Sequence, residues 1–567
     1  MVFGCQFGMF VREKRINGYS YLYLVESVRE DGRSKQRIIK NLGRKEVVLA
    51  DGGLDRLAAS IARYADRASV LAQLAAGNPD GLSCKRIGAP LLFGRLWQES
   101  GIAAVFEELL AGRQFEFPVE RAVFATVLHR IMVSGSDRAC DKWLEDYDIP
   151  GTEELGLHHL YRAMAWLGEE LPDEEQGDAT PFAPRTVKDL VEERLFARRH
   201  DLFTDLSVVF MDTTSLYFEG AGGETLGARG HSKDYRPQLA QMILGVVIDQ
   251  DGRPICTEMW PGNTADVSVL VPVIDRLRSR FGIGRVCVVA DRGMISAATI
   301  AALEERGLEY VLGARERTDR IVRGEVVLAD ERPYTPLCLE RAGGDETQLF
   351  IKEVKVAGKR YIVCRNEAVA IEEAETRRKV VAALDRQLTR GDKALIGNSA
   401  YRRFLRPVSD AKPGRKHKLF EIDAGKLAEE ARFDGVFVLR SNARISPLQA
   451  VIRYRDLQNV ERLFRVAKAT MRTRPIYHSS DAAIRGHVFC SFLALILHQA
   501  LDEKLRRAGK RVEWADLLRD LDRLQEVTIS KRGQQIVLRT PATNSIGPIF
   551  KAAGVALPAN VRDASAS

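Results

Sequence analysis

The sequence predicts an α/β protein whose core is a mixed β-sheet flanked by helices. Three apolar stretches have the length of strands and follow one another closely, at 206–218, 239–249 and 254–260. An Asp-Gly turn joins the last two of them. Beyond them, helical and strand patterns alternate: a helix at 267–280, a strand at 285–291, a helix at 296–307 and a strand at 308–312. The run 285–291 is continuously apolar, which is typical of a buried parallel strand.

Two aspartates lie on these predicted strands. Asp212 is in the middle of the first strand, and Asp291 ends the fourth. Three antiparallel strands followed by helix, strand, helix and strand make up the ribonuclease-H-like arrangement, in which the first and fourth strands are neighbours. The two carboxylates are therefore expected to lie side by side.

A third acid is predicted on a helix far along the chain. Val460, Leu463, Phe464, Ala467 and Met471 recur at the helical period and form one apolar stripe. On a second face, Tyr454, Glu461 and Lys468 follow one another at intervals of seven residues. For an isolated helix, a solvated charged face is the simpler interpretation; the two upstream aspartates favour a functional one.

Carboxylates placed together suggest a metal site. Two adjacent carboxylates do not both stay ionised cheaply unless a cation lies between them. A third acid completes an all-oxygen site, which suits Mg²⁺. Two such ions, with Mn²⁺ able to substitute, could activate an attacking oxygen and stabilise a leaving one in phosphodiester cleavage.

Composition sets wider bounds. The 567 residues carry a net charge of +8 and are 45% hydrophobic, which is ordinary for a globular protein of several domains. No signal-peptide pattern or membrane-length apolar run is expected, and the eight cysteines are scattered. These observations predict a cytoplasmic protein without a disulfide framework or a zinc site.

The N-terminal segment is basic and strand-like. Residues 11–42 alternate apolar and polar side chains around Asn-Gly and Asp-Gly turns, which predicts a small antiparallel sheet. Ten Lys or Arg stand against four Asp or Glu between Arg12 and Lys45. The sheet is either a DNA-reading surface or an edge sheet protected by charge.

Six segments are predicted. They are an N-terminal hairpin and helix region (1–78), a helical domain (79–200), the first part of the α/β core (201–313), a β-rich insertion (314–432), the second part of the core (433–502) and a C-terminal region (503–567).

Together, Asp212, Asp291 and the helical Tyr454, Glu461 and Lys468 resemble a DDE transposase of a bacterial insertion sequence. More narrowly, they resemble the group marked by Tyr, two residues, Arg, three residues, Glu, six residues and Lys. Leu457 stands at the arginine position and departs from the signature; Arg453, Arg455 and Arg465 are candidates to replace it. Residues 262–266, 433–436 and 40–43 also look like this family.

The resemblance implies a DNA transposase that acts on the element's terminal inverted repeats and on target DNA, as a homodimer holding two ends. Asp212, Asp291 and Glu461 would be catalytic and hold two Mg²⁺. It also implies that the insertion before the final Glu contacts the transposon end, and the closest resemblance implies a DNA hairpin intermediate. The residues expected to contact DNA are Tyr454, Lys468, Arg465, Arg455, Lys233, Arg236 and Trp260. For Trp260, stacking on an unpaired base competes with a role in the core.

Other functions stay open. A ribonuclease-H-like nuclease or resolvase would use the same carboxylates without strand transfer. A catalytically inactive DNA-binding protein descended from a transposase would bind the ends without cutting them. A metallophosphatase would leave the basic N-terminal sheet unexplained.

Overall fold

The computed structural model describes residues 9–30, 33–54, 57, 80–177, 183–199, 208–283, 286–340, 346–390, 403–407, 420–531 and 534–563. The helix of the predicted N-terminal region, which the Ala-rich stretch 54–77 is expected to form, lies almost entirely outside these residues. The chain forms two compact units, which are described separately. One comprises residues 1–91, 146–148 and 512–567, and the other comprises 92–145 and 149–511.

A nine-stranded sheet forms the centre of the larger unit. Five of its strands lie in the order β7-β6-β5-β8-β9. They are β5 (Val208–Tyr217), β6 (Gln241–Ile248), β7 (Pro254–Pro261), β8 (Cys287–Ala290) and β9 (Glu309–Gly313). β5 pairs antiparallel with β6 and parallel with β8, and β8 pairs parallel with β9. This is the predicted ribonuclease-H-like order, so the α/β fold class is confirmed.

The register of β5 and β8 brings the two aspartates together. Met211 of β5 pairs with Ala290 of β8, so Asp212 and Asp291 are the next residue on each strand. Side chains alternate along β5. Val209 and Met211 lie in the hydrophobic core with α10, which places Asp212 on the opposite face of the sheet.

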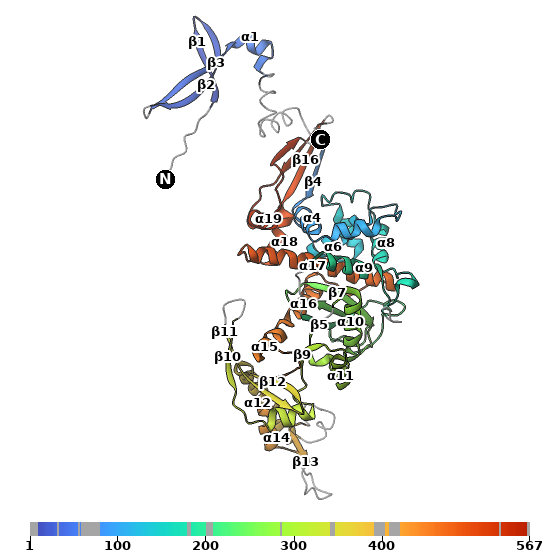
Figure 1. The fold of residues 1–567 in the computed structure, drawn as a ribbon. Helices are drawn as coiled ribbons and strands as arrows, with labels where there is room; N and C mark the ends of the chain where they lie inside the picture. Colours follow the sequence, from blue (N-terminus) through green and yellow to red (C-terminus); the bar gives the residue numbers. More distant parts are fainter. Residues whose placement is uncertain are drawn as a thin grey trace. The chain divides into compact units, whose positions relative to one another are not determined.

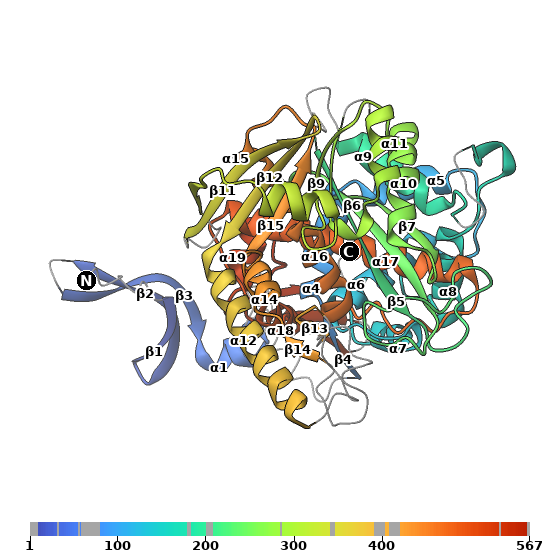
Figure 2. The same cartoon turned by 90° about the horizontal axis from the view of Figure 1, so that it is seen from below.

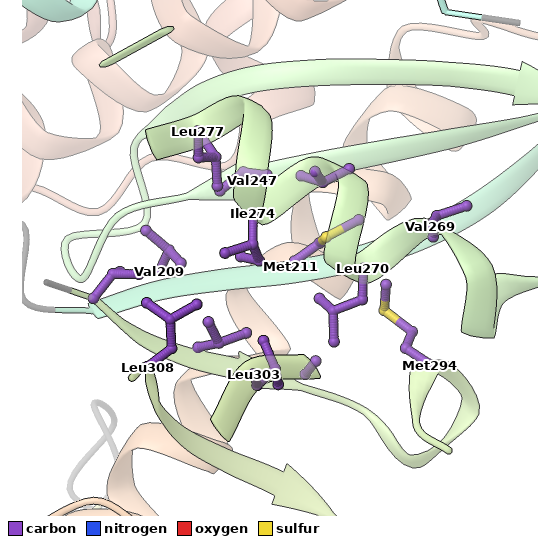
Figure 3. Packing of buried hydrophobic residues seen from close by; sticks show 14 of the residues in the cluster. Val209, Met211, Val247, Val269, Leu270, Ile274, Leu277, Met294, Leu303 and Leu308 are labelled. Carbon is purple, nitrogen blue, oxygen red and sulfur yellow. The ribbon is translucent and has the colours of Figure 1, made fainter. Parts of the chain in front are cut away.

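That core explains why the strands are apolar. Helices α10 (Asp266–Phe281) and α11 (Ala297–Glu305) pack on one face of the sheet, with the short 3₁₀ turn Arg292–Met294 beside them (Figure 2). Leu270, Ile274 and Leu277 of α10 meet Val209 and Val247 of the strands (Figure 3). Fully burying side chains of this size stabilises the fold by roughly 1.5–3 kcal/mol each.

The strands of the predicted insertion continue this same sheet. After β9 the order runs β15-β12-β11-β10, all antiparallel. The strands are β10 (Thr335–Glu340), β11 (Glu346–Val356), β12 (Lys359–Asn366) and β15 (Val436–Ser441). Figure 1 shows them extending beyond β9. The segment predicted to be β-rich does contain strands, and three of them, β10, β11 and β12, belong to the sheet of the core.

Other elements accompany these strands. They are the π-helix Val322–Leu328, α12 (Glu367–Arg390), the short pair β13 (Leu405–Pro407) and β14 (Phe420–Ile422), and α14 (Ala424–Ala431). Leu384 and Leu388 of α12 pack on Phe404 and Leu405 in a small core of their own.

The single helix expected to carry Glu461 is interrupted. It consists of α15 (Pro447–Asp456), α16 (Gln458–Arg465) and a π-helix (Val466–Thr470). The buried Leu457 separates the first two. On both sides of the break, amides bond to the carbonyl three residues back: Leu457 to Tyr454 and Val460 to Leu457. Such bonds tighten the turn. α15 begins at a capping box of Ser446 and Gln449.

Helices make up the rest of this unit, as predicted for the segment before the core. They are α5 (Ile102–Leu110), α6 (Val119–Met132), α7 (Asp137–Leu144), α8 (Leu157–Leu167), a 3₁₀ turn at Asp173–Glu175, α9 (Val187–Arg199) and α17 (Asp481–Arg507). Among the described residues, α17 alone is long and apolar enough for a membrane span, and 83% of its most apolar window is buried. That burial is typical of a core helix.

The smaller unit contains two sheets. The N-terminal sheet has the predicted hairpin order β1 (Met9–Ile16), β2 (Tyr19–Glu30) and β3 (Arg33–Arg44), followed by α1 (Lys45–Ala50). The other is ordered β18-β17-β16-β4. It consists of β4 (Gly81–Arg86), β16 (Gln525–Lys531), β17 (Gln534–Arg539) and β18 (Val561–Asp563). Helices α18 (Trp514–Arg523) and α19 (Ile546–Ala553) complete the unit, and α4 (Gly88–Glu99) contains the point where the chain passes to the larger one.

Candidate active site

Asp212 is a half-buried acid in the middle of β5. Burial raises the pKa of its carboxyl to about 6. The Lys233 ammonium and the Thr213 amide, which donates to Asp212 Oδ1 over 2.7 Å, oppose this rise, while the charges of Asp291 and Glu461 add to it. Asp291 and Glu461 therefore both lie close enough to Asp212 for their charges to act on it.

Asp291 is held by a tyrosine of α15. The Tyr454 hydroxyl donates to Asp291 Oδ1 over 2.8 Å. Burial raises the pKa of this phenol well above its ordinary value, and Asp291 contributes to the same shift. Tyr454, which was expected to position DNA, thus positions an acid in this structure.

A glycine makes room for that tyrosine. A Cβ on Gly313, the last residue of β9, would lie 2.5 Å from the Tyr454 hydroxyl and 3.2 Å from the Arg292 amide nitrogen. Any larger residue would displace the tyrosine from Asp291. No sequence pattern singled Gly313 out, because the close approach joins elements far apart in the chain.

Glu461 is exposed on α16, which contacts β5 and β6. A cavity of about 600 Å³ has Asp291, Tyr454 and Glu461 in its wall. Arg455 and Leu457 also line it, as do Thr347, Leu349, Asn366 and Phe437 from the strands beyond β9. The extended sheet therefore forms one side of the space in front of the acids.

Lys468 lies in the π-helix and pairs with a loop residue. Its ammonium donates to Asp234 Oδ1 over 2.9 Å, and Arg474 lies 2.9 Å from the other oxygen of the same carboxylate. Burial lowers the pKa of Lys468, although Asp234 opposes the shift. Asp234 was not predicted, since a loop aspartate carries no signal of a partner so distant in the chain.

Lys233 links the same loop to β5 and α10. Its ammonium donates to the Thr213 carbonyl and hydroxyl, each over 2.8 Å, and lies 3.0 Å from Asp266. The Thr213 hydroxyl donates to Asp266 as well. Lys233 was predicted to contact DNA; in this structure it is one of the cations nearest Asp212, and Asp266 holds it there.

The remaining predicted DNA contacts differ in accessibility. Arg236 and Arg465 are exposed, and the Arg236 guanidinium lies 5.3 Å from the centre of the Tyr217 ring. Of the replacements for the signature arginine, Arg453 bonds to the thiol of Cys287 in β8. Arg465 stays available on the face that carries Glu461.

Trp260 is a core residue. It is 8% exposed in β7, and its ring lies over Gly245 of β6, where an added Cβ would be 2.8 Å away. The stacking role predicted for Trp260 therefore needs a correction: its buried ring has no free face for a base.

A second cluster of potential ligands lies outside this site. Among the described residues, Asp137, His478 and His487 bring their ligand atoms within 4.8 Å of one another. The Arg130 guanidinium lies 2.9 Å from His487 Nδ1 and 3.8 Å from Asp137. A cation of the protein itself thus already balances the Asp137 charge.

A ribonuclease-H-like sheet with an acid on its first strand, a second after its fourth and a third on a following helix is the arrangement expected of a DDE transposase. A family model described as the transposase DDE domain matches residues 204–497, more than half of the sequence, and the chain belongs to that family. The N-terminal domain of IS1634 family transposases matches residues 11–75.

Solved structures give a more distant likeness, while a search of curated proteins found no match. A piggyBac transposase synaptic complex with hairpin DNA is 13% identical, with 76% of this chain and 79% of that chain covered and a TM-score of 0.35. The Mos1 transposase paired-end complex with the left transposon end is 14% identical, with 36% and 64% covered and a TM-score of 0.14. The Mos1 mariner paired-end complex with Mn is 14% identical, with 36% and 65% covered and a TM-score of 0.13.

Proposed function

We propose that this transposase cleaves the ends of its element and joins them to target DNA by metal-dependent phosphodiester chemistry at Asp212, Asp291 and Glu461. The observation that supports this most is the effect of both other acids on the half-buried Asp212, with Asp291 and Glu461 in the wall of one cavity. The three acids come from three separate elements. The packing of the sheet does not require acids at these positions to lie close together.

The donor set fits divalent cations. All three side chains offer carboxylate oxygens, the ligands that Mg²⁺ prefers and Mn²⁺ accepts. Burial disfavours the ionised form of Asp212 and raises its pKa, and a cation bound to the carboxylate would favour that form. Two Mg²⁺ held by these residues would supply a nucleophile activated at neutral pH and charge stabilisation of the leaving oxygen.

The residues around the acids position the Asp291 carboxylate and the DNA backbone. Tyr454 fixes one oxygen of Asp291. Lys233, Arg236, Arg455, Arg465 and Lys468 supply positive charge for the DNA backbone, which sets its register without reading its sequence. A water molecule first attacks the phosphodiester at the element's end and leaves a 3′-OH; that 3′-OH then attacks a target phosphodiester and expels a new 3′-OH.

The proposed partner is double-stranded DNA, both the terminal inverted repeats and the target. A homodimer would hold two ends at once, in the cytoplasm of a bacterial cell. The N-terminal sheet is a candidate reader of the repeats, because Arg12, Arg15 and Lys40 leave it basic and exposed.

The test is cleavage of labelled DNA carrying the repeats that flank the gene. Wild type, Glu461→Gln and the control Glu305→Gln, an exposed acid of α11, are compared in Mg²⁺ and in EDTA. We expect nicking at the repeat boundary with wild type and the control in Mg²⁺ only, and loss of at least 100-fold in Glu461→Gln with DNA binding kept, the order that removing a metal ligand or transition-state contact costs. Full cleavage by Glu461→Gln would remove this residue from the site.

A strand-transfer experiment with a pre-cleaved DNA end distinguishes the proposed function from the remaining alternatives. Transfer of its 3′-OH to plasmid DNA is expected of the transposase. Cutting without transfer would instead indicate a nuclease or resolvase, and end binding without metal-dependent cutting would indicate an inactive descendant.

A further inference from the structure

Asp266, the first residue of α10, is a further acid beside the proposed site. Its Oδ1 accepts a hydrogen bond of 2.8 Å from the hydroxyl of Thr213, the residue that follows Asp212 on β5. A Cβ added to Gly293, which comes shortly after Asp291, would lie 4.0 Å from Asp266 Oδ2. Another carboxylate therefore lies next to the chain that continues from both strand acids.

The second oxygen of Asp266 binds a cation. Lys233 Nζ lies 3.0 Å from Asp266 Oδ2, and it donates to the Thr213 carbonyl and hydroxyl over 2.8 Å each. The side chains of Lys233 and Asp266 are 29% and 25% exposed, and charges that are partly buried are screened less than those at the surface. Two hydrogen bonds and one ion pair thus hold the ammonium.

Close packing of the backbone keeps Lys233 within reach of Asp266. A Cβ added to Gly230, on the loop that carries Lys233, would overlap the carbonyl oxygen of Gly262. Gly262 lies in the turn between β7 and α10, just before Asp266. The Lys233 amide also donates to the Ser215 hydroxyl of β5 over 2.9 Å. The loop is therefore fixed against both β5 and the start of α10.

Lys233 is a potential competitor for the Asp212 carboxylate. Burial raises the pKa of Asp212, and among the groups that oppose this rise the Lys233 ammonium has the largest effect. An ammonium paired with a carboxylate occupies oxygens that a metal ion needs, and its charge repels a divalent ion nearby. In this structure the ammonium is held instead by Thr213 and Asp266. Asp266 thus keeps the cation near Asp212 while the carboxylate stays available.

We propose that Asp266 is a positioning residue that keeps the Lys233 ammonium from pairing with Asp212, so that a divalent cation binds there. The proposal rests on the function proposed above, because Asp212 must hold the metal ion. Asp266 also offsets the charge of Lys233, which lowers the repulsion that the bound ion meets. Without Asp266, the ammonium keeps only Thr213 and turns to the acids, and the metal affinity of the site falls.

The test measures Mn²⁺ bound by the full-length protein without DNA, by electron paramagnetic resonance, with Asp212→Asn to identify the ion bound at this site. We expect Asp266→Asn to bind that ion about tenfold more weakly than wild type, because a negative charge is lost and a positive one is released beside it. Removing the cation as well should reverse the loss. Asp266→Asn combined with Lys233→Met should therefore bind within about threefold of wild type.

Cleavage gives a second readout. Asp266→Asn should need about tenfold more Mg²⁺ for half-maximal cleavage of end DNA and should regain most of the wild-type rate at high Mg²⁺. Asp275→Asn is the matched control, because Asp275 lies on the same helix and pairs with Arg306 over 2.7 Å. The control should keep the wild-type affinity for Mn²⁺.

The double variant distinguishes positioning from a structural role and from direct binding of the metal by Asp266. It lacks both partners of the ion pair, so either of those roles would leave its Mn²⁺ affinity as low as that of Asp266→Asn. That result would overturn the proposal, as would wild-type Mn²⁺ affinity in Asp266→Asn. A wild-type protein that neither binds Mn²⁺ at Asp212 nor cuts end DNA would instead overturn the proposed function itself.

Discussion

A single hydrogen bond connects the signature tyrosine to an acid of the proposed site. Tyr454 donates to Asp291 Oδ1, and a hydrogen bond to a charged group contributes about 1.5–3 kcal/mol. The bond leaves the second carboxylate oxygen of Asp291 for a metal ion and fixes its direction. Outer partners of this kind orient metal ligands elsewhere.

Tyr454→Phe should therefore cleave DNA roughly 10- to 100-fold more slowly at limiting Mg²⁺, because Asp291 loses the group that orients it. Raising Mg²⁺ should restore part of the rate, which a Mg²⁺ titration of cleavage measures.

The control is Tyr310→Phe, which removes another tyrosine hydroxyl bonded to a carboxylate, that of Glu304 over 2.6 Å. Tyr310 also lies in the central sheet but away from the acids, so its variant should keep the wild-type Mg²⁺ dependence. Equal losses in both variants would mean that the effect comes from general destabilisation.

Asp212 makes the metal-free protein sensitive to pH. Its folded pKa of about 6 is above the ordinary value of 3.8, so the native state keeps a proton that the unfolded chain has released. Stability from this group is thus present at low pH and is lost as pH rises through the folded value. Above pH 6 the ionised carboxylate costs about 2 kcal/mol or more in the absence of metal.

In EDTA at pH 8, Asp212→Asn should be about 2 kcal/mol more stable than wild type, and the difference should shrink at pH 5. Urea unfolding at both pH values measures it. A variant that is less stable than wild type at pH 8 would show that Asp212 is not strained by burial.

The sequence could single out the three candidate acids but not the residues that hold them. Asp212, Asp291 and Glu461 could be found because each has a recognisable local setting: a charge in an apolar strand, a strand end and a helix face. Asp234 and Lys468 meet across 234 positions of the chain, and the space for Tyr454 at Gly313 depends on packing. Neither leaves a local pattern.

At the scale of elements, a buried network of charges fastens α9 to the central sheet. Arg280 of α10 donates to Glu192 and Glu193 of α9 over 2.9 and 2.7 Å and lies 3.0 Å from Asp189 and 3.3 Å from Glu258 of β7. Lys188 lies 2.8 Å from Asp189, and Arg276 3.1 Å from Glu258. Each charge depends on the others because water does not reach them.

Arg280→Met should destabilise the protein by about 3–5 kcal/mol, since it leaves buried carboxylates with too few cations. Arg306→Met is the matched control: Arg306 pairs with Asp275 near the surface, and its loss should cost less than about 1 kcal/mol. Urea unfolding gives both values. A similar small cost for the two would show that the network contributes little to folding.

The strands and helices of the core could be predicted from the period of their hydrophobic residues, and their order along the chain predicted the topology. The break at Leu457 could not be predicted from the hydrophobic period, because the apolar stripe continues across it without glycine or proline. The turn tightens there only through its hydrogen bonds. The union of β10–β12 with the core sheet could not be predicted either. A strand's own residues do not specify which edge it will join.

At the scale of the whole molecule, each compact unit contains parts of the chain that are far apart in sequence. β4 pairs with β16, so the start of the predicted helical domain and the C-terminal hairpin share a sheet. The six predicted segments stay a prediction; they assign β4 to the segment 79–200 and β16 to the segment 503–567.

Buried histidines should make the metal-free protein labile in acid. Burial lowers the pKa of both His129 and His498 to about 4. The unfolded chain takes up these protons below pH 6.5 and the native state does not, so stability is lost as pH falls from 6.5 towards 4. Each histidine contributes up to about 3 kcal/mol to this loss of stability. The two contributions together are larger than the opposite effect of Asp212.

Urea midpoints at pH 7.5, 6.5, 5.5 and 4.5 should decline through this window, and His129→Gln should decline less steeply. An unchanged midpoint down to pH 4.5 would show that the histidines take up protons without unfolding.

The pairing of β9 with β15 has a consequence for how proteins with this core can vary in evolution. Gly313 lies opposite Leu439, so the chain between them, which includes β10, β11 and β12, starts and ends at neighbouring positions of the sheet. The distance in sequence between the second and third carboxylates therefore has no bearing on their distance in space. Lineages of this core can lengthen or trim that interval and still inherit the same arrangement of acids.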